Sequence, residues 1–179
     1  MKLKITPINK ETVLQENEMI ISKTDLTGKI TYANRTFMAI SQLSEAELLG
    51  VQHNIIRHPD MPRATFKMLW DNLQNGEEYF AYVKNICKDG GFYWVLANIT
   101  PDYDQDGNVL GYFSVRRRPS PEAIATVIPI YSRMLEIEAM HSPKEALIKS
   151  LEYLHGHLKN QGLTYNQFIY GLMQQEGYL

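Results

Sequence analysis

"EYFAYVKNICK" (78–88), "FYWVLANITP" (92–101) and "NVLGYFSVRRR" (108–118) are the segments that decide the fold. All three are rich in the aromatic and β-branched residues that favour strands. Their two junctions contain Asp-Gly, at 89–90 and 106–107, and this pair is the strongest short signal for a tight hairpin. The pattern therefore predicts an antiparallel meander of three long strands.

Two shorter runs upstream predict another hairpin. "MIISKT" (19–24) and "KITYA" (29–33) are β-prone, and Thr27-Gly28 between them is a turn signal. Residues 1–18 show no periodicity, so we expect an N-terminal cap or a loose arm there.

The region between the two groups of strands carries short, interrupted helical signals. Asn34 is a suitable N-cap for "RTFMAIS", and Ser44 with Glu47 three residues later forms a capping box for "EAELLG". A longer helix is predicted to begin near Pro62 and to end at Gly76.

The chain becomes entirely helical after residue 119. Three helix starts are predicted, each at a hydroxyl N-cap: Ser120 before Pro121, Ser142 with Glu145 as a capping box, and Thr164 with Gln167.

These helices carry apolar residues three and four positions apart, which is typical of helices that pack on a partner helix. We expect the packing faces to be Ile124, Ile128, Tyr131 and Leu135, then Leu147, Leu151, Leu154 and Leu158, then Phe168, Ile169, Leu172 and Met173. Pro129 is expected to kink the first helix. Such faces pack on one another, on a second copy of the chain, or on a partner.

The order of elements predicts the α+β class: a five-stranded antiparallel sheet with short helices over one face, plus a C-terminal helical extension. The expected organisation is an N-terminal cap at 1–18, a sensory domain at 19–119 and the extension at 120–179. A sheet covered by a basket of short helices is expected to enclose a cavity, which suits ligand sensing.

Composition narrows the function classes. The formal net charge is -2 and the isoelectric point about 6.2, which argues against a nucleic-acid surface. The basic run Arg116–Arg118 is interpreted as a solvated strand end. The single cysteine, Cys87, and the polar N-terminus predict a cytoplasmic protein, and no apolar run approaches the roughly 18 residues of a membrane segment.

The stretch "HNIIRHPDMP" (53–62) crowds charged residues among isoleucines. Taken alone, His53 or His58 is most simply a structural hydrogen bonder, and Asp60 a cap for the next helix. Together they favour the wall of a pocket, because polar groups beside buried isoleucines need buried partners.

Metal and enzyme interpretations are weaker. His53 and His58 lack a third ligand at a recognisable spacing. Cys87 has no histidine near it in sequence and is interpreted as structural. The segment at Gly28 lacks phosphate-loop spacing. We therefore expect a protein that is not an enzyme.

Several motifs, in their order, resemble the PAS fold. "YANRTF", "HNIIRHPDMP", "FKMLWDNLQNGE", "YVKNICKDGGFYWVLANITP" and "GYFSVRRRPS" are similar to the FAD-binding PAS domain of the aerotaxis receptor (Aer) family, from about Met19 to about Tyr131. The resemblance implies a signal-transduction domain that binds FAD non-covalently and senses redox or oxygen state.

The resemblance also implies the cofactor-binding residues. Those matching positions needed for FAD binding are Arg57, His58 and Asp60; those matching positions around the flavin are His53, Trp70 and Asn85; and those matching polar pocket positions are Asn34 and Asn98. Trp70 offers a flat face to the ring, Asn85 and Asn98 can donate and accept at its polar edge, and Arg57 can meet phosphate.

Two departures from related families matter. Blue-light relatives carry a reactive cysteine where "GVQHN" has His53, which excludes cysteinyl-adduct photochemistry. Aerotaxis receptors continue into a membrane anchor and a signalling domain, so this chain is expected to be a receptor fragment or a free-standing sensor that acts through a homodimer or a signalling protein partner. The alternative is a PAS interaction module that binds no ligand or binds haem, with His53 or His58 as axial ligand.

Overall fold

The computed structural model describes residues 5–178. The chain forms two compact units. Unit 1 comprises Met1–Pro59 and Asn72–Arg118, and unit 2 comprises Asp60–Asp71 and Pro119–Leu179. Residues 60–71 thus belong with the C-terminal helices, although in sequence they lie between segments of the first unit.

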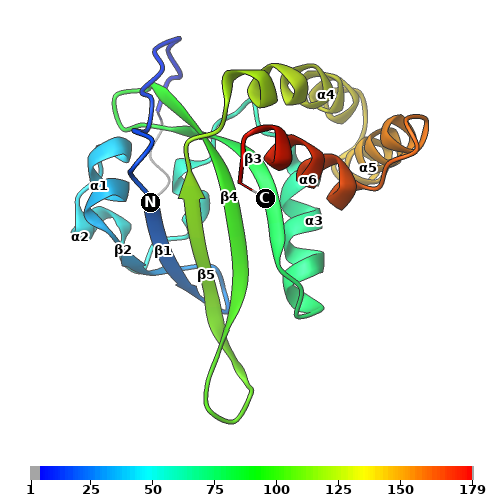
Figure 1. The fold of residues 1–179 in the computed structure, drawn as a ribbon. Coiled ribbons are helices and arrows are strands. Elements are labelled where there is room, and N and C mark those ends of the chain that lie inside the picture. The colour runs from blue at the N-terminus through cyan, green and yellow to red at the C-terminus, as the bar shows by residue number, and fades with distance from the viewer. Residues whose placement is uncertain (1–4, 179) are drawn as a thin grey trace. The chain divides into compact units, whose positions relative to one another are not determined.

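Unit 1 is built on one antiparallel sheet of five strands (Figure 1). The strands are β1 (Ile20–Asp25), β2 (Ile30–Ala33), β3 (Tyr79–Ile86), β4 (Phe92–Tyr103) and β5 (Val109–Arg117), in the spatial order β2-β1-β5-β4-β3. This arrangement confirms the predicted hairpin, the predicted meander and the α+β class. The pairing that joins hairpin and meander is between β1 and β5.

Glycines in the left-handed region allow the predicted turns. Gly28, Gly90 and Gly107 have φ angles of 82°, 94° and 83°. Other residues adopt this conformation only with strain, so these positions end one strand and begin the next.

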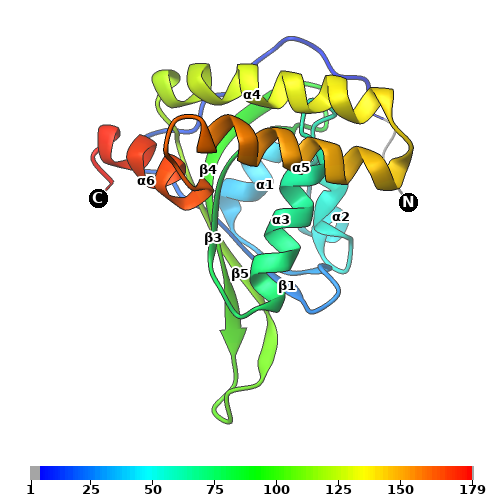
Figure 2. The same cartoon turned by 90° about the vertical axis from the view of Figure 1, so that its right-hand side faces the viewer.

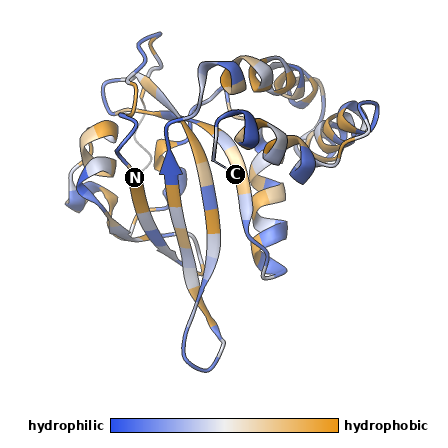
Figure 3. Ribbon diagram, viewed as in Figure 1, coloured by the Kyte–Doolittle hydropathy of each residue, from blue (hydrophilic) through white to orange (hydrophobic). Residues whose placement is uncertain are grey.

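The hydrophobic core of unit 1 lies against one face of the sheet, here called the inner face. Strand residues Ile20, Tyr93, Val95 and Ala97 pack there with apolar residues of the short helices and turns. The helices are α1 (Arg35–Ser41), α2 (Glu45–Leu48) and the 3₁₀ turn η1 (His53–Ile56), and their buried contributions include Phe37, Leu48 and Ile56. In β4, residues 92–97 are all buried, so both faces of that strand are covered there. Figure 3 shows hydrophobic and hydrophilic segments within the strands.

Polar caps define the short helices as predicted. Asn34 Oδ1 accepts from the Phe37 backbone N–H at 3.0 Å, and Ser44 with Glu47 forms a complete capping box. Lys88 and Ser44 together hold the pKa of Glu47 down at about 2.

The N-terminal arm pairs with the start of β4. Thr12 N donates to Phe92 O and Phe92 N donates to Lys10 O, both at 2.8 Å. Leu14, only 2% exposed, belongs to the core cluster. In the described part of the arm, from residue 5 onward, this pairing fits a cap and not a loose tail.

Unit 2 is helical. It contains the first part of α3 (Arg63–Gln74), then α4 (Pro121–Met140), α5 (Pro143–Lys159) and α6 (Tyr165–Gln175). Figure 2 shows α4 and α5 running side by side. Ser120 and Thr164 cap α4 and α6 as predicted. The predicted capping box at Ser142 is incomplete, since the hydroxyl donates to the Glu145 carboxylate and accepts no backbone N–H.

The predicted packing faces need correction in two helices. In α4 the buried residues are Ala123, Val127, Ile130, Tyr131, Met134 and Glu138, whereas Ile128 is 43% exposed. In α5 they are Ala146, Ser150, Leu154 and Leu158, with Leu147 and Leu151 only half-buried. In both helices the buried face differs from the predicted face by about one residue, because the location of the partner helix decides which side of a helix is buried.

Across residues 5–178, no helix is both long enough and apolar enough to cross a bilayer.

Candidate functional site

The inner face of the sheet in unit 1 is unusually polar for a core. Ser22 on β1, Asn85 on β3, and Ser114 and Arg116 on β5 are each at most 9% exposed. They share this face because Ser22 lies opposite Ser114, Arg116 opposite Ala97, and Asn85 opposite Tyr93. A few convergent polar groups among apolar and aromatic residues are typical of a small-molecule site.

A chain of polar contacts joins three of the elements. Arg116 Nη2 donates to Ser22 Oγ, and Ser22 Oγ lies 3.2 Å from His53 Nε2. Because Ser22 Oγ accepts this hydrogen bond from Arg116, the Ser22 hydroxyl can donate its own hydrogen bond to His53 Nε2. The neutral His53 tautomer with its proton on Nδ1 satisfies this arrangement.

His53 is held neutral by its surroundings. Burial of the ring and, secondly, the nearby Arg116 cation lower the pKa of His53 from 6.5 to about 3. The ring also stacks on Phe37, with centroids 5.7 Å apart and an interplanar angle of 26°. His53, one of the predicted site residues, therefore faces the inner side of the sheet as a neutral hydrogen-bonding aromatic.

Arg116 corrects the interpretation of the basic run as a solvated strand end. It is 2% exposed and its guanidinium carbon lies 4.5 Å from the centre of the Phe37 ring. Burial lowers the pKa of Arg116 to about 10, so it stays positively charged at neutral pH. The neighbouring Arg117 is exposed. Figure 3 shows that the end of β5 is hydrophilic.

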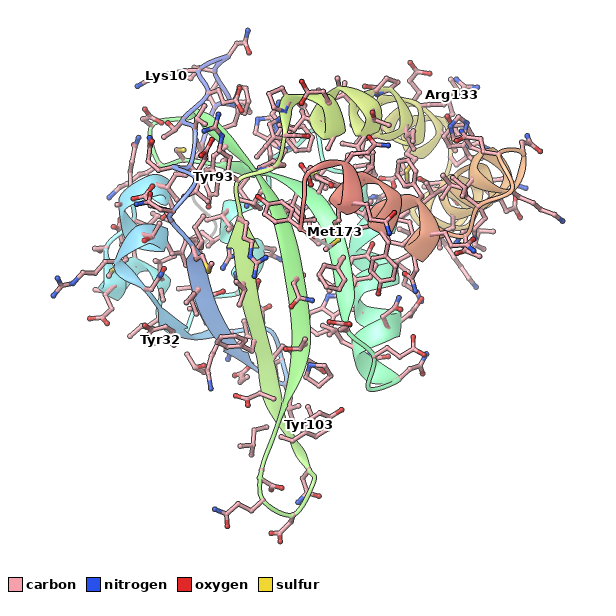
Figure 4. The ribbon with its side chains drawn as sticks, in the orientation of Figure 1. Lys10, Tyr32, Tyr93, Tyr103, Arg133 and Met173 are labelled. Carbon is pink, nitrogen blue, oxygen red and sulfur yellow. The ribbon has the colours of Figure 1, made fainter. Side chains whose placement is uncertain are left out.

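Tyr93, on β4, adds a second buried polar group at the inner face. Figure 4 labels it near the start of the strand, where the N-terminal arm passes. Burial raises the pKa of its hydroxyl well above the usual value, with Arg116 opposing this shift. In the described chain neither the Tyr93 hydroxyl nor Nε and Nη1 of Arg116 has a hydrogen-bond partner.

The structure brings three more of the predicted residues together at the edge strand β3. Arg57 and Asn85 form an isolated antiparallel bridge between their backbones. His58 follows Arg57, is 3% exposed, and packs edge-on against Phe92 at 6.0 Å between ring centroids. Segment 57–58 thus lies along the edge of the sheet beside the buried amide of Asn85.

Asn34 has a structural role in the geometry. Its Oδ1 accepts from Ile21 N and Phe37 N at 3.1 and 3.0 Å, and its Nδ2 donates to Met19 O at 2.8 Å. The Asn34 side chain thus links α1 to β1. Its amide oxygen and nitrogen are both hydrogen-bonded to backbone atoms.

Asn98 lies apart from the other site residues of unit 1. It is an odd number of positions from Tyr93 in an unbroken stretch of β4, so it points to the opposite face of the sheet. There its amide donates to Glu78 Oε2 at 3.0 Å. The structure does not bring Asn98 to the inner face.

Asp60 and Trp70 belong to unit 2, where Asp60 is exposed and Trp70 half-buried on α3. The start of α3 is bound by Glu138 of α4, whose carboxylate accepts from the Arg63 and Ala64 backbone N–H groups at 2.9 and 3.0 Å. Glu138 is 7% exposed and satisfies donors that a helix start leaves unpaired.

Cys87 is structural, as its sequence context indicates. The thiol is buried and donates to Ile40 O at 3.2 Å, and burial raises its pKa to about 11. A thiol with this pKa is a poor nucleophile at neutral pH.

The fold can be compared with known proteins. The family model described as a PAS fold matches residues 30–116, which span most of the sheet and its short helices. Residues 30–116 of this chain have the PAS fold. The light-oxygen-voltage domain whose mechanism was probed with a flavin analogue has the same fold, with a TM-score of 0.55 and 22% identity over 64% of this chain and 86% of that chain.

Sequence relatives of the PAS domain are sensory and regulatory proteins. The aerotaxis receptor of Escherichia coli is 42% identical over 125 residues, which are 70% of this chain and 24% of the receptor. The nitrogen fixation regulatory protein of Klebsiella pneumoniae is 29% identical over 106 residues, 59% of this chain and 21% of that protein. This chain therefore spans about a quarter or less of these relatives.

Sequence reasoning missed four polar residues of the inner face of unit 1: Ser22, Tyr93, Ser114 and Arg116. Alternation along β5 gave the wrong signal, because Phe113 and Val115 are the apolar set and yet are only half-buried. The pairing of Arg116 with Ile20 and Ala97 places it inside, and that pairing is not visible in the local sequence.

Proposed function

We propose that this chain is a redox-sensing PAS domain that binds FAD and transmits the state of the flavin to its helical extension or to a partner. The observation that carries the proposal is the bridge between Arg57 and Asn85, with buried His58 beside it. It unites, at one sheet edge, residues that are 28 positions apart in sequence and that the resemblance to aerotaxis receptors implicates in FAD binding.

The relatives support a flavin. The most similar protein named above is an aerotaxis receptor, and the fold matches a light-oxygen-voltage domain studied with a flavin analogue. His53 stands where blue-light relatives carry their reactive cysteine, which favours redox sensing over adduct photochemistry.

The residues of unit 1 fit such a cofactor. Arg57 is half-buried at the sheet edge and supplies positive charge suited to the phosphates. Asn85, His53 and the unpartnered Tyr93 hydroxyl supply polar groups among aromatic rings, as a flat heteroaromatic ring requires. Bound FAD would supply the electron-accepting chemistry, which these side chains do not have.

Within the proposal, the remaining predicted residues have unequal support. Asp60 and Trp70 stay proposed as FAD-binding residues on the resemblance alone. Asn34 is proposed to act indirectly, by holding α1 and β1 in place, and Asn98 has no role in binding because it faces away from the inner side.

The output is proposed to be a cytoplasmic protein contact, made by a homodimer or a signalling partner, through unit 2. Large apolar side chains stay exposed on its helices, among them Ile128 at 43%, Met140 at 71% and Ile148 at 49%. Sedimentation of the full chain against a chain truncated after Ser120 tests this: a monomeric full chain that binds no partner contradicts it.

An absorbance spectrum of the purified full chain tests the cofactor. Flavin bands in the blue region, with FAD identified by chromatography after heat release, are the expected result. A Soret band would indicate haem instead, and a featureless spectrum after reconstitution with FAD would indicate a ligand-free interaction module.

A further inference from the structure

The end of β5 carries a buried cation whose donors the protein satisfies only in part. Arg116 is 2% exposed and donates through Nη2 to Ser22 Oγ. Across residues 5–178, neither its Nε nor its Nη1 has a hydrogen-bond partner, although both atoms are buried. A guanidinium has five N–H donors, so more than half of its capacity is unused.

Arg116 also lacks a counter-charge, since no carboxylate of the described chain forms an ion pair with it. Its neighbours are the Phe37 ring, at 4.5 Å, and the neutral groups Ser22 and His53. A cation–π contact and one hydrogen bond compensate little of the cost of removing a guanidinium from water. A charge held this way is destabilising to the protein alone, so a ligand acceptor is the simplest reason for it.

The surroundings indicate which part of a ligand Arg116 meets. Phosphates are strongly hydrated and suit the half-buried Arg57 at the sheet edge. Arg116 lies deep at the inner face, beside two aromatic rings and the unpartnered Tyr93 hydroxyl. This combination of flat apolar surface and unused hydrogen-bond donors matches a heteroaromatic ring that carries oxygen and nitrogen acceptors, and not a phosphate.

We propose that Arg116 is the cationic donor to the flavin ring, with Nε–H and Nη1–H directed to oxygen or nitrogen acceptors of the isoalloxazine. This inference rests on the proposed function as an FAD-binding domain. Bound FAD would supply the electron-accepting chemistry, and reduction by an external donor without matching proton uptake would leave negative charge on the ring. Arg116 would stabilise that charge and would itself transfer neither a proton nor an electron.

The test compares wild type, Arg116→Met and Arg116→Lys in the full chain, titrated with dithionite against a reference dye. Arg116→Met removes the charge at similar length, and Arg116→Lys is the matched control that keeps it. We expect Arg116→Met to shift the midpoint potential to a more negative value, equivalent to a loss of about tenfold or more in affinity for reduced over oxidised flavin. Arg116→Lys should shift it less. An unchanged potential in Arg116→Met overturns the inference.

A second measurement decides the question if Arg116→Met retains too little flavin to titrate. Without FAD, Arg116→Met should melt at or above the wild-type temperature, because an unpaired buried charge is gone, and added FAD should raise its melting temperature less than that of wild type. A lower melting temperature without FAD, together with a wild-type rise on adding FAD, would show a purely structural arginine and overturn the inference. Wild type that binds no flavin overturns the proposed function itself, whereas flavin-loaded variants with an unchanged potential overturn the role of Arg116 alone.

Discussion

Two basic regions of unit 1 differ in whether the sequence reveals their location in the fold. Segment 57–58 carries Arg57 and His58 in a recognisable motif, and the structure sets it against Asn85 at the edge of the sheet. The end of β5 carries Arg116 in a run of three arginines that resembles a solvated strand end, yet Arg116 is buried at the inner face. A sequence motif can thus indicate residues at the sheet edge, here called the rim, while strand pairing decides which charged residue lies at the inner face.

The largest expected effect tests the rim. Arg57→Ala or His58→Ala should release FAD, with affinity lowered by about tenfold to a hundredfold, because Arg57 loses a charge-assisted contact and His58 loses a polar aromatic side chain. Flavin content by absorbance measures this, and circular dichroism checks that the fold survives. Arg117→Ala is the matched control, since that arginine is exposed. If both rim variants keep stoichiometric flavin while folded, the assignment of segment 57–58 is wrong.

The next effect is the pH dependence of folding stability that comes from His53, the neutral histidine beside Arg116. The pKa of His53 is lowered from 6.5 to about 3 in the folded protein, so between these values the unfolded chain binds a proton that the folded chain does not. The stability from this group is present above pH 6.5 and is lost as the pH falls toward 3, by at most about 1.4 kcal/mol per pH unit.

Urea unfolding at a series of pH values between 5 and 7 measures that slope. His53→Gln, which keeps a hydrogen-bonding side chain beside Ser22, should show a smaller dependence than wild type in this window. Equal slopes for the two proteins would mean that His53 is not held neutral by burial and Arg116.

A smaller effect is expected in the hydrogen exchange of the sheet when the flavin is reduced. Reduction changes the hydrogen-bonding capacity of the flavin ring, and the Asn85 amide can reverse its orientation in response. Hydrogen exchange in residues 79–88 and 92–100 should therefore differ between the oxidised and reduced protein. Identical exchange profiles in both states, with the flavin shown to be reduced, would exclude this route of signalling.

The smallest expected effect is at Asn98. Its side chain faces away from the inner side and donates to Glu78, so Asn98→Ala should change FAD affinity by no more than about twofold. Flavin titration by fluorescence measures this. A loss comparable with that of Arg57→Ala would place the cofactor on the other face of the sheet.

Much of the fold could be predicted because its signals are local. The Asp-Gly turns, the Asn34 cap and the capping boxes at Ser44 and Thr164 all appear where the sequence indicates them. The helix faces were harder: Ile128 was expected to be buried and is 43% exposed, since the face that a helix buries depends on where its partner lies.

The sequence by itself determined the strands, their turns, the order of helices and the rim motif that includes Arg57 and His58, because each depends on neighbouring residues. Only the tertiary structure decided which charged residue lies at the inner face. A strand alternates its side chains between two faces, but its own residues do not state which set is inside. The pairing of β5 with β1 and β4 turned Arg116 inward and left Phe113 and Val115 half-buried, since register across strands is set by contacts far apart in the chain.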